Sequence, residues 1–223
     1  MKPRINITVL FVLLFIIAET MIAQNVYGPQ GPNYIREIWK IGSNPVQSQL
    51  IALNSYSIIG KNQVSGQDAF QRVLIQWNIP DNAIPDNSTI SAVRLYFTYT
   101  KYNHTYEMDA EFSSLPLDIQ NLNQSQNEQL WQLMNTTGIG SQTGSNNVLE
   151  FISNNPNDDF NLAVRNALLD DRFVLGIIAY VPPAVTERIW HIQNPSVTLR
   201  IEFIPPTQEV TVNQKLSNNN SVD

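Results

Sequence analysis

The chain has 223 residues, no cysteine, and a formal net charge of −6 at pH 7 from 13 basic and 19 acidic side chains. An acidic balance argues against nucleic acid as a partner, because phosphates require a positive surface. The absence of cysteine excludes disulfides, thiolate zinc sites and cysteine nucleophiles, so stability must come from packing. The length suits one β domain with a real core plus tails.

Residues 1–23 are predicted to be a signal peptide. Lys2 and Arg4 form a positive start, and the apolar run 7–18 (ITVLFVLLFIIA) is too short to span a bilayer comfortably. A retained signal anchor is the alternative. Export without cysteine is typical of bacteria, so we expect an extracellular or cell-surface protein, with the periplasm as the other location. No transmembrane segment is expected after cleavage.

The rest of the chain divides into three predicted parts. Residues 24–44 (QNVYGPQGPNYIREIWKIGSN) look like a lead-in segment, because the alternation in "YIREIWKIG" is imperfect. Residues 45–206 form the predicted β-sandwich domain. Residues 207–223 are either a tail or the start of a following segment.

Three segments in the first half of the domain alternate between apolar and polar residues, as strands with one buried face do. The first ends at Pro80, because proline cannot donate to a ladder. We expect the second and third to form a hairpin in which Arg94 lies opposite Glu111. The inward sets are Val73, Ile75, Trp77 and Ile79; Val93, Leu95, Phe97 and Tyr99; and Tyr106, Met108, Ala110 and Phe112.

Helical and further strand patterns follow. Residues 123–134 and 157–171 have helical spacing, and residues 136–147 (TTGIGSQTGSNN) are predicted to be a loop between them. Residues 172–181 are apolar on both faces, which predicts a covered strand, and residues 196–203 alternate again. The pattern predicts an all-β fold, an antiparallel β-sandwich, jelly-roll-like, with one or two short helices in the connections.

The segment 70–99 (FQRVLIQWNIPDNAIPDNSTISAVRLYFTY) resembles the exported DNRLRE-type domains that are related to the disaggregatase repeats. Trp77 stands where that family usually has Phe, and the resemblance weakens before Phe70. It implies a jelly-roll sandwich, often attached to polysaccharide-active or surface proteins and in some members assigned as a carbohydrate-binding module. No binding residue carries over. The matching residues are Arg72, Leu74, Ile75, Trp77, Ile79, Pro80, Ile90, Ala92, Leu95 and Tyr96.

Sugar-binding modules use exposed aromatic rings as platforms, with amide, guanidinium and carboxylate groups that bind hydroxyls. The residues outside the predicted core that could serve in this way lie on the predicted hairpin and before the last strand. The alternative for each is packing within the hairpin or anchoring of a loop. The candidate ligand-binding residues are Arg94, Tyr96, Tyr102, Asn103, His104, Trp190 and His191.

Glu107, Asp109 and Glu111 share one strand face, with ~6.5 Å between successive Cα atoms. They are candidates for a calcium site if a loop supplies carbonyl oxygens, or for paired glycosidase carboxylates. The alternative is a solvated face that keeps the sheet soluble. No other cofactor is expected.

We therefore expect a non-catalytic exported β-sandwich module that binds polysaccharide or other surface components. One alternative is a structural or adhesive module of a bacterial surface protein without a small ligand. A glycan-active enzyme is a second alternative, but the chain has no G-x-S-x-G elbow and no H-x-x-x-H spacing.

Overall fold

A computed structural model describes residues 24–206, so the signal-peptide and tail predictions lie outside the described residues. Antiparallel strands and two short α-helices make up the described part, which confirms the all-β, sandwich-like fold class. The helices are α2 (Gln124–Leu133) and α3 (Asp159–Ala167). The strands are β1 (Asn25–Gln30), β2 (Tyr34–Ile41), β3 (Gln47–Ile51), β4 (Tyr56–Val64), β5 (Gln67–Asn78), β6 (Thr89–Tyr102), β7 (Asp109–Ser114), β8 (Gly138–Thr143), β9 (Val148–Ser153), β10 (Arg172–Ala179), β11 (Arg188–Gln193) and β12 (Thr198–Ile204).

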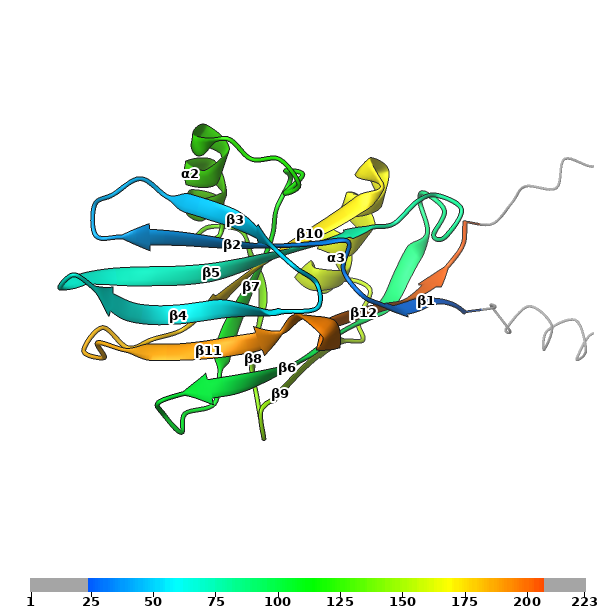
Figure 1. The fold of residues 1–223 in the computed structure, drawn as a ribbon. Coiled ribbons are helices and arrows are strands. Elements are labelled where there is room, and N and C mark those ends of the chain that lie inside the picture. The colour runs from blue at the N-terminus through cyan, green and yellow to red at the C-terminus, as the bar shows by residue number, and fades with distance from the viewer. Residues whose placement is uncertain (1–23, 207–223) are drawn as a thin grey trace, which may run out of the picture.

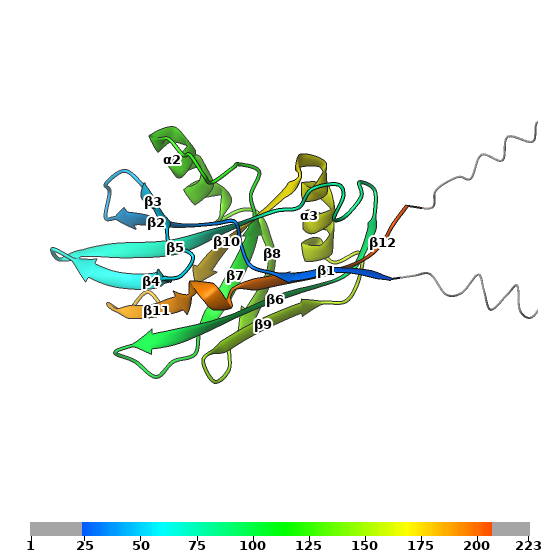
Figure 2. The same ribbon diagram turned by 45° about the vertical axis from the view of Figure 1, so that its right-hand side comes forward.

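The long strand β5 joins the two layers of the sandwich. The first half of β5 pairs with β4 and its second half with β10, while β2 pairs along the other edge. The strands β3, β2, β5, β4, β11 and β6 lie side by side in a front layer, and β10, β7 and β8 lie behind them (Figure 1). β6 extends past β11 to pair with β12 and β9, and β1 completes that end beside β12 (Figure 2).

The main core lies between these layers. The inward faces predicted for β5 and β6, which include Trp77 and Phe97, are buried there, as is the predicted inward face of β12. From the rear layer, β7 contributes Phe112 and β10 contributes Phe173, and α3 adds Phe160. Four aromatic rings of this core form edge-on and tilted contacts, which aromatic quadrupoles favour.

A smaller core lies beneath α2, on the side of β5 and β10 that is turned away from the main core. Leu74 of β5 and Val174 of β10 pack there against Leu130 and Trp131 of the helix. The helix begins with a capping box at Asn123, which satisfies free backbone donors of its first turn. Both faces of β10 are therefore buried, as its apolar pattern predicted.

The predicted lead-in segment belongs to the sandwich. β1 pairs with β12, and β2 pairs with β5 and β3, so no boundary separates residues 24–44 from the domain. Arg36 and Glu37 of β2 are each 7% exposed, and these buried charges disturb the apolar alternation. Arg36 is satisfied by the carbonyl oxygens of Ile119 and Gln120. The pattern therefore resembled an irregular segment.

The predicted hairpin between β6 and β7 is wrong. β6 pairs with β9, β11 and β12, whereas β7 pairs with β8 and β10 in the rear layer. Arg94 lies opposite Arg200 and Ile152, and Glu111 lies opposite Ser141 and Ile178. Residues 103–108 cross between the layers. Both strands turn apolar faces to the same core, and alternation does not say which strand is the neighbour.

The predicted loop at residues 136–147 is also partly wrong. It contains β8, which pairs with β7 at the edge of the rear layer. Gly140 in this strand faces the rings of Phe112 and Phe151, and a Cβ atom added to it would lie 3.1 Å from the ring of Phe151. Close packing by aromatic neighbours thus explains a glycine that resembled a loop residue.

Candidate functional site

An uncovered sheet face is the candidate site. No helix lies in front of β2, β5, β4, β11 and β6 in the half of the sheet farthest from β1 and β12 (Figure 1). The register aligns Trp39, Gln71, Gly60, Ile189 and Tyr102 in one row across these five strands. Directly opposed residues share a face, so the row lies on one side of the sheet. We call this side the open face.

Gly60, in the middle of this row, has no side chain and lies against the backbone of β11. Gly60 has φ +125°, and a Cβ atom at this position would lie 2.1 Å from the carbonyl oxygen of Arg188. Only glycine fits this close approach between β4 and β11. Beside the row lies a cavity of about 310 Å³, which we call the notch, and it is lined by Glu37, Trp39, Ile41, Gln49, Ile58, Val64, Ala69 and Gln71.

Glu37 supplies a buried carboxylate to this notch. It accepts a hydrogen bond of 2.6 Å from the backbone N–H of Ile58, and burial raises its pKa despite that bond and one from Gln49. The side-chain Oε1 of Gln71 is buried and has no hydrogen-bond partner among the described residues. The notch therefore offers acceptor groups to a ligand that carries hydroxyl or amide donors.

Three aromatic side chains from three strands stack beside the notch. The ring of His191 lies between those of Tyr56 and Tyr102, with centroid distances of 4.7 and 5.7 Å and interplanar angles of 15° and 23°. Both tyrosines are 47% exposed. Burial lowers the pKa of His191, because desolvation disfavours the charged imidazolium.

Of the residues predicted to bind a ligand, Tyr102 and His191 meet on the open face. Asn103 follows Tyr102 directly and is exposed, with φ +55° in the turn that ends β6. Trp190 is 0% exposed, and its indole N–H donates to the carbonyl of Tyr106 over 3.1 Å. It lies in strand β11 with its ring toward the core, so the prediction of a ligand contact through Trp190 is wrong.

His104 lies on the other side of this sheet. Its Nε2 is 2.8 Å from the carbonyl oxygen of Ile189, and its ring meets Trp190 edge-on with centroids 4.9 Å apart. Burial lowers its pKa. Tyr106 was predicted to be inward but is 58% exposed, beneath the guanidinium of Arg188 at 3.9 Å. The two-residue period fails there because Tyr106 precedes β7 in the connection between layers.

Arg94 and Tyr96 lie on the outer side of β6, beyond the open face. Both side chains are exposed, and Tyr96 lies opposite Thr198 of β12 and Glu150 of β9. They share this side with Tyr102, because all three occupy alternate positions of one strand. The structure thus separates the predicted sugar-binding residues into two groups along β6.

The three candidate calcium ligands, Glu107, Asp109 and Glu111, do not converge on one point. Glu107 binds Lys101 and the phenol of Tyr99, and these hydrogen bonds lower the pKa of its carboxyl. Burial, together with the bond to Glu107, raises the pKa of Tyr99 to about 12. Asp109 accepts a 3.1 Å bond from Thr143, and Glu111 is exposed on β7. Within residues 24–206, no group of three or more His, Asp or Glu side chains is arranged to hold a metal ion.

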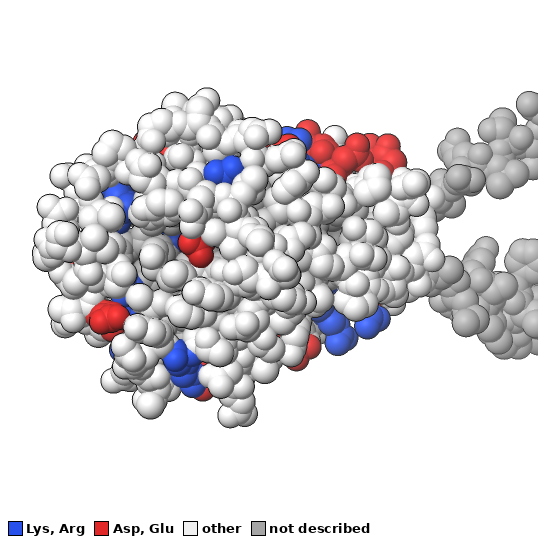
Figure 3. Space-filling view, viewed as in Figure 1, with Lys and Arg blue, Asp and Glu red and all other residues white. Residues whose placement is uncertain are grey.

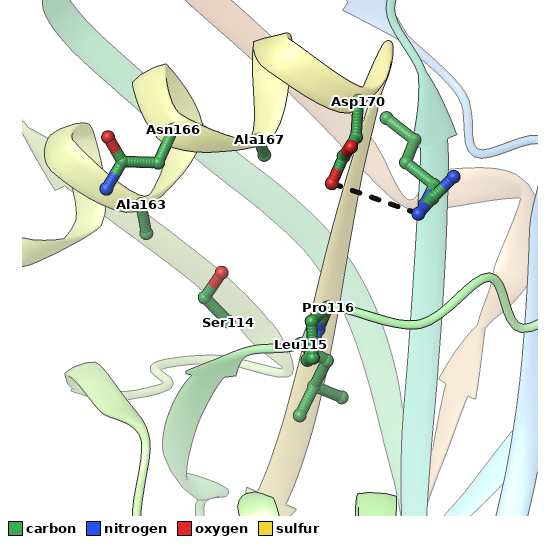
Figure 4. A pocket seen from close by; sticks show the side chains of 8 residues that line it. Ser114, Leu115, Pro116, Ala163, Asn166, Ala167 and Asp170 are labelled. Carbon is green, nitrogen blue, oxygen red and sulfur yellow. Dashed lines mark ion pairs between the residues drawn. The ribbon is translucent and has the colours of Figure 1, made fainter. Parts of the chain in front are cut away.

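A second cavity of about 310 Å³ lies between α3 and the start of the segment that follows β7 (Figure 4). Asp170 and Arg172 form an ion pair of 3.9 Å at one side, and Asn166 projects from the helix at the other. Both members of the ion pair are partly exposed, so the attraction between them is worth little. Ala163 and Ala167 leave room between these polar groups.

Sequence reasoning missed Trp39, Glu37, Gln71 and Tyr56. The alternation of Glu37 and Trp39 in "REIWKIG" was visible, but nothing in it indicated that β2 lies beside β5 and that β5 lies beside β4. A scan against protein-family models and a search of curated proteins found no match to this chain. The resemblance of residues 70–99 to DNRLRE-type domains therefore stays a prediction. In the described part of the chain, no helix has the length and apolar character needed to cross a membrane.

Proposed function

We propose that the protein is a non-catalytic, exported module that binds a polysaccharide on its open face. The observation that carries this proposal is the aromatic stack of Tyr56, His191 and Tyr102 beside a notch that contains buried hydrogen-bond acceptors. Aromatic rings provide apolar contact for the C–H faces of sugars, and the amides and carboxylate around the notch suit hydroxyl groups. A mixture of apolar walls and a few fixed polar groups is typical of ligand sites.

The width of the open face suits an extended polymer. Trp39 and Tyr102 lie four strand spacings apart, which is roughly 19 Å at the usual distance between neighbouring strands. A ligand that spans this row would contact several strands at once. The centre of this face carries few charged side chains, so a polymer bound there needs no matching charge (Figure 3).

A binding role is favoured over glycoside hydrolysis. Hydrolysis of a glycosidic bond normally requires two carboxyl groups that flank it. Among the described residues that line the notch, Glu37 is the single carboxylate. Its pKa is raised by burial, and hydrogen bonds from Ile58 and Gln49 hold it in place, which suits a fixed acceptor.

The test is binding of the mature protein to a panel of soluble and insoluble polysaccharides, by affinity electrophoresis and sedimentation. Trp39→Ala and Tyr102→Ala are each expected to weaken binding about tenfold, the loss that ~1.4 kcal/mol of contact energy gives. Tyr180→Ala is the matched control, because Tyr180 is 51% exposed but follows β10 in the rear layer. Absence of binding to every polysaccharide, or equal loss in all three variants, would refute the proposal.

A further inference from the structure

Two arginines stand directly opposite each other on the outer side of the sheet, beyond the open face. Arg94 of β6 pairs in register with Arg200 of β12. Side chains at opposed positions of antiparallel strands share a face, with Cβ atoms roughly 5 Å apart. Like charges at such positions destabilise the pair unless an anion lies between or beside them.

The protein offsets only part of this charge. A terminal nitrogen of Arg200 lies 3.1 Å from Glu202, whose carboxylate also accepts a 2.9 Å bond from Gln24. The Nε–H of Arg200 is buried and finds no acceptor among the described residues. Arg94 is exposed and forms no ion pair within residues 24–206. By register, the nearest acids to Arg94 are Glu150, opposite Tyr96, and Glu202, opposite Ala92, and neither lies directly opposite Arg94.

The arginine pair and the open face are connected along one strand. Arg94, Tyr96, Thr98, Thr100 and Tyr102 occupy alternate positions of β6 and therefore share its outer side. The eight residue steps from Arg94 to Tyr102 span roughly 26 Å of extended chain. Basic side chains are visible near β6 and β12 at the lower right of the molecule, away from the weakly charged centre (Figure 3).

We propose that the arginine pair binds the carboxylate or sulfate groups of an acidic polysaccharide whose chain lies along β6 toward Tyr102. Planar guanidinium groups form paired hydrogen bonds to such anions, and an anion beside both arginines removes their repulsion. The net negative charge of the protein does not prevent this, because charges farther apart than about 8 Å are largely screened at physiological salt. The proposal names the ligand class for the function proposed above and rests on it.

The experiment compares charged and uncharged forms of the same polymers. Polygalacturonate and its methyl ester differ in the carboxylate, and dextran sulfate and dextran differ in the sulfate. Wild-type protein is expected to bind at least one charged polymer about tenfold more tightly than its uncharged form at about 0.05 M salt. The polymer pair that shows this preference identifies the anion. The preference should shrink at about 0.5 M salt, because screening weakens exposed ion contacts.

Arg94→Gln and Arg200→Gln are expected to remove most of this preference and to leave binding of the uncharged polymer unchanged. Arg165→Gln is the matched control, since Arg165 is an exposed arginine that lies on α3 rather than on β6 or β12. An unchanged preference in both arginine variants would overturn the arginine site, even where Tyr102→Ala still abolishes binding. If Tyr102→Ala loses binding but the wild type shows no preference for charged polymers, the arginine site is refuted. The proposed polysaccharide binding on the open face is then still supported.

Discussion

The two sides of β2 and β5 differ in what covers them. On one side, Ile38 and Leu74 are 0% exposed beneath α2, and Arg72 lies over the ring of Trp131 at 3.7 Å. On the other side, Ile35 and Val73 face the main core, whereas Trp39 and Gln71 at the far end of the strands are only partly buried and line the notch. A surface that the fold closes carries continuous apolar side chains. A surface that it leaves open carries single rings separated by amides, which remain compatible with water.

The largest loss of stability is expected on the side of β2 and β5 that α2 covers. Trp131→Ala removes a ring that is 6% exposed and the cation–π contact with Arg72, so the free energy of unfolding should fall by about 3–5 kcal/mol. Urea unfolding followed by circular dichroism measures this loss. Leu169→Ala is the control, because Leu169 is 68% exposed and should change little. Similar losses in both variants would show that α2 does not close a core.

A smaller loss is expected on the open face from Gly60→Ala. The new methyl group would lie 2.1 Å from the carbonyl oxygen of Arg188, at a φ of +125° that side chains rarely adopt. We expect a loss of about 1–3 kcal/mol from the strained backbone. Gly66→Ala is the control, since its φ is +78° but nothing lies near its added atom. Equal losses would assign the effect to φ alone rather than to the β4–β11 contact.

Glu37→Gln should change the pH dependence of stability. Burial raises the pKa of Glu37 above its ordinary 4.5, so the folded state holds the proton more tightly than the unfolded state. The wild type therefore loses stability as pH rises from about 4.5 through the folded pKa, and the neutral amide removes this loss. Denaturant midpoints at a series of pH values measure the difference. A variant that is relatively less stable at pH 7 than at pH 4 would contradict it.

The smallest change in stability is expected from His191→Gln in the aromatic stack. Burial lowers the pKa of His191 below its ordinary 6.5, so the unfolded state takes up the proton first. Wild-type stability should fall as pH drops below 6.5, and His191→Gln should reduce this fall. His104 also has a lowered pKa and stays in both proteins, so the difference between them isolates His191. Identical pH profiles would show that burial in the stack does not lower the pKa of His191.

Much of the fold could be predicted because a period of two reports which side of a strand is buried. The faces around Trp77, Phe97 and Leu199 were predicted correctly for this reason. The same period does not indicate which strands pair, and for this reason Arg94 was predicted to lie opposite Glu111 instead of Arg200. Strand pairing depends on contacts between residues far apart in the chain, and local pattern does not encode them.

The candidate site was harder to predict than the fold. Tyr102 and His191 were identified by their polar, aromatic context, but the stack also needs Tyr56 from a third strand. Gly60 was not identified, because its role depends on the close approach of β11 to β4. Trp190 was misassigned because its segment resembled a loop, and only pairing with β4 and β6 turns its ring inward.

The antiparallel pairing of β1 with β12 also determines how the molecule responds to mechanical load. Asn25 lies opposite Phe203, so residues 24 and 206 leave the same end of the sandwich (Figure 1). A force that pulls these two residues apart would peel β1 from β12 one hydrogen bond at a time. A force between residue 206 and a ligand held at Tyr102 would instead act along β6, and its many bonds to β12 would have to shear together. The protein should therefore resist a load on a bound ligand better than a load across its own ends.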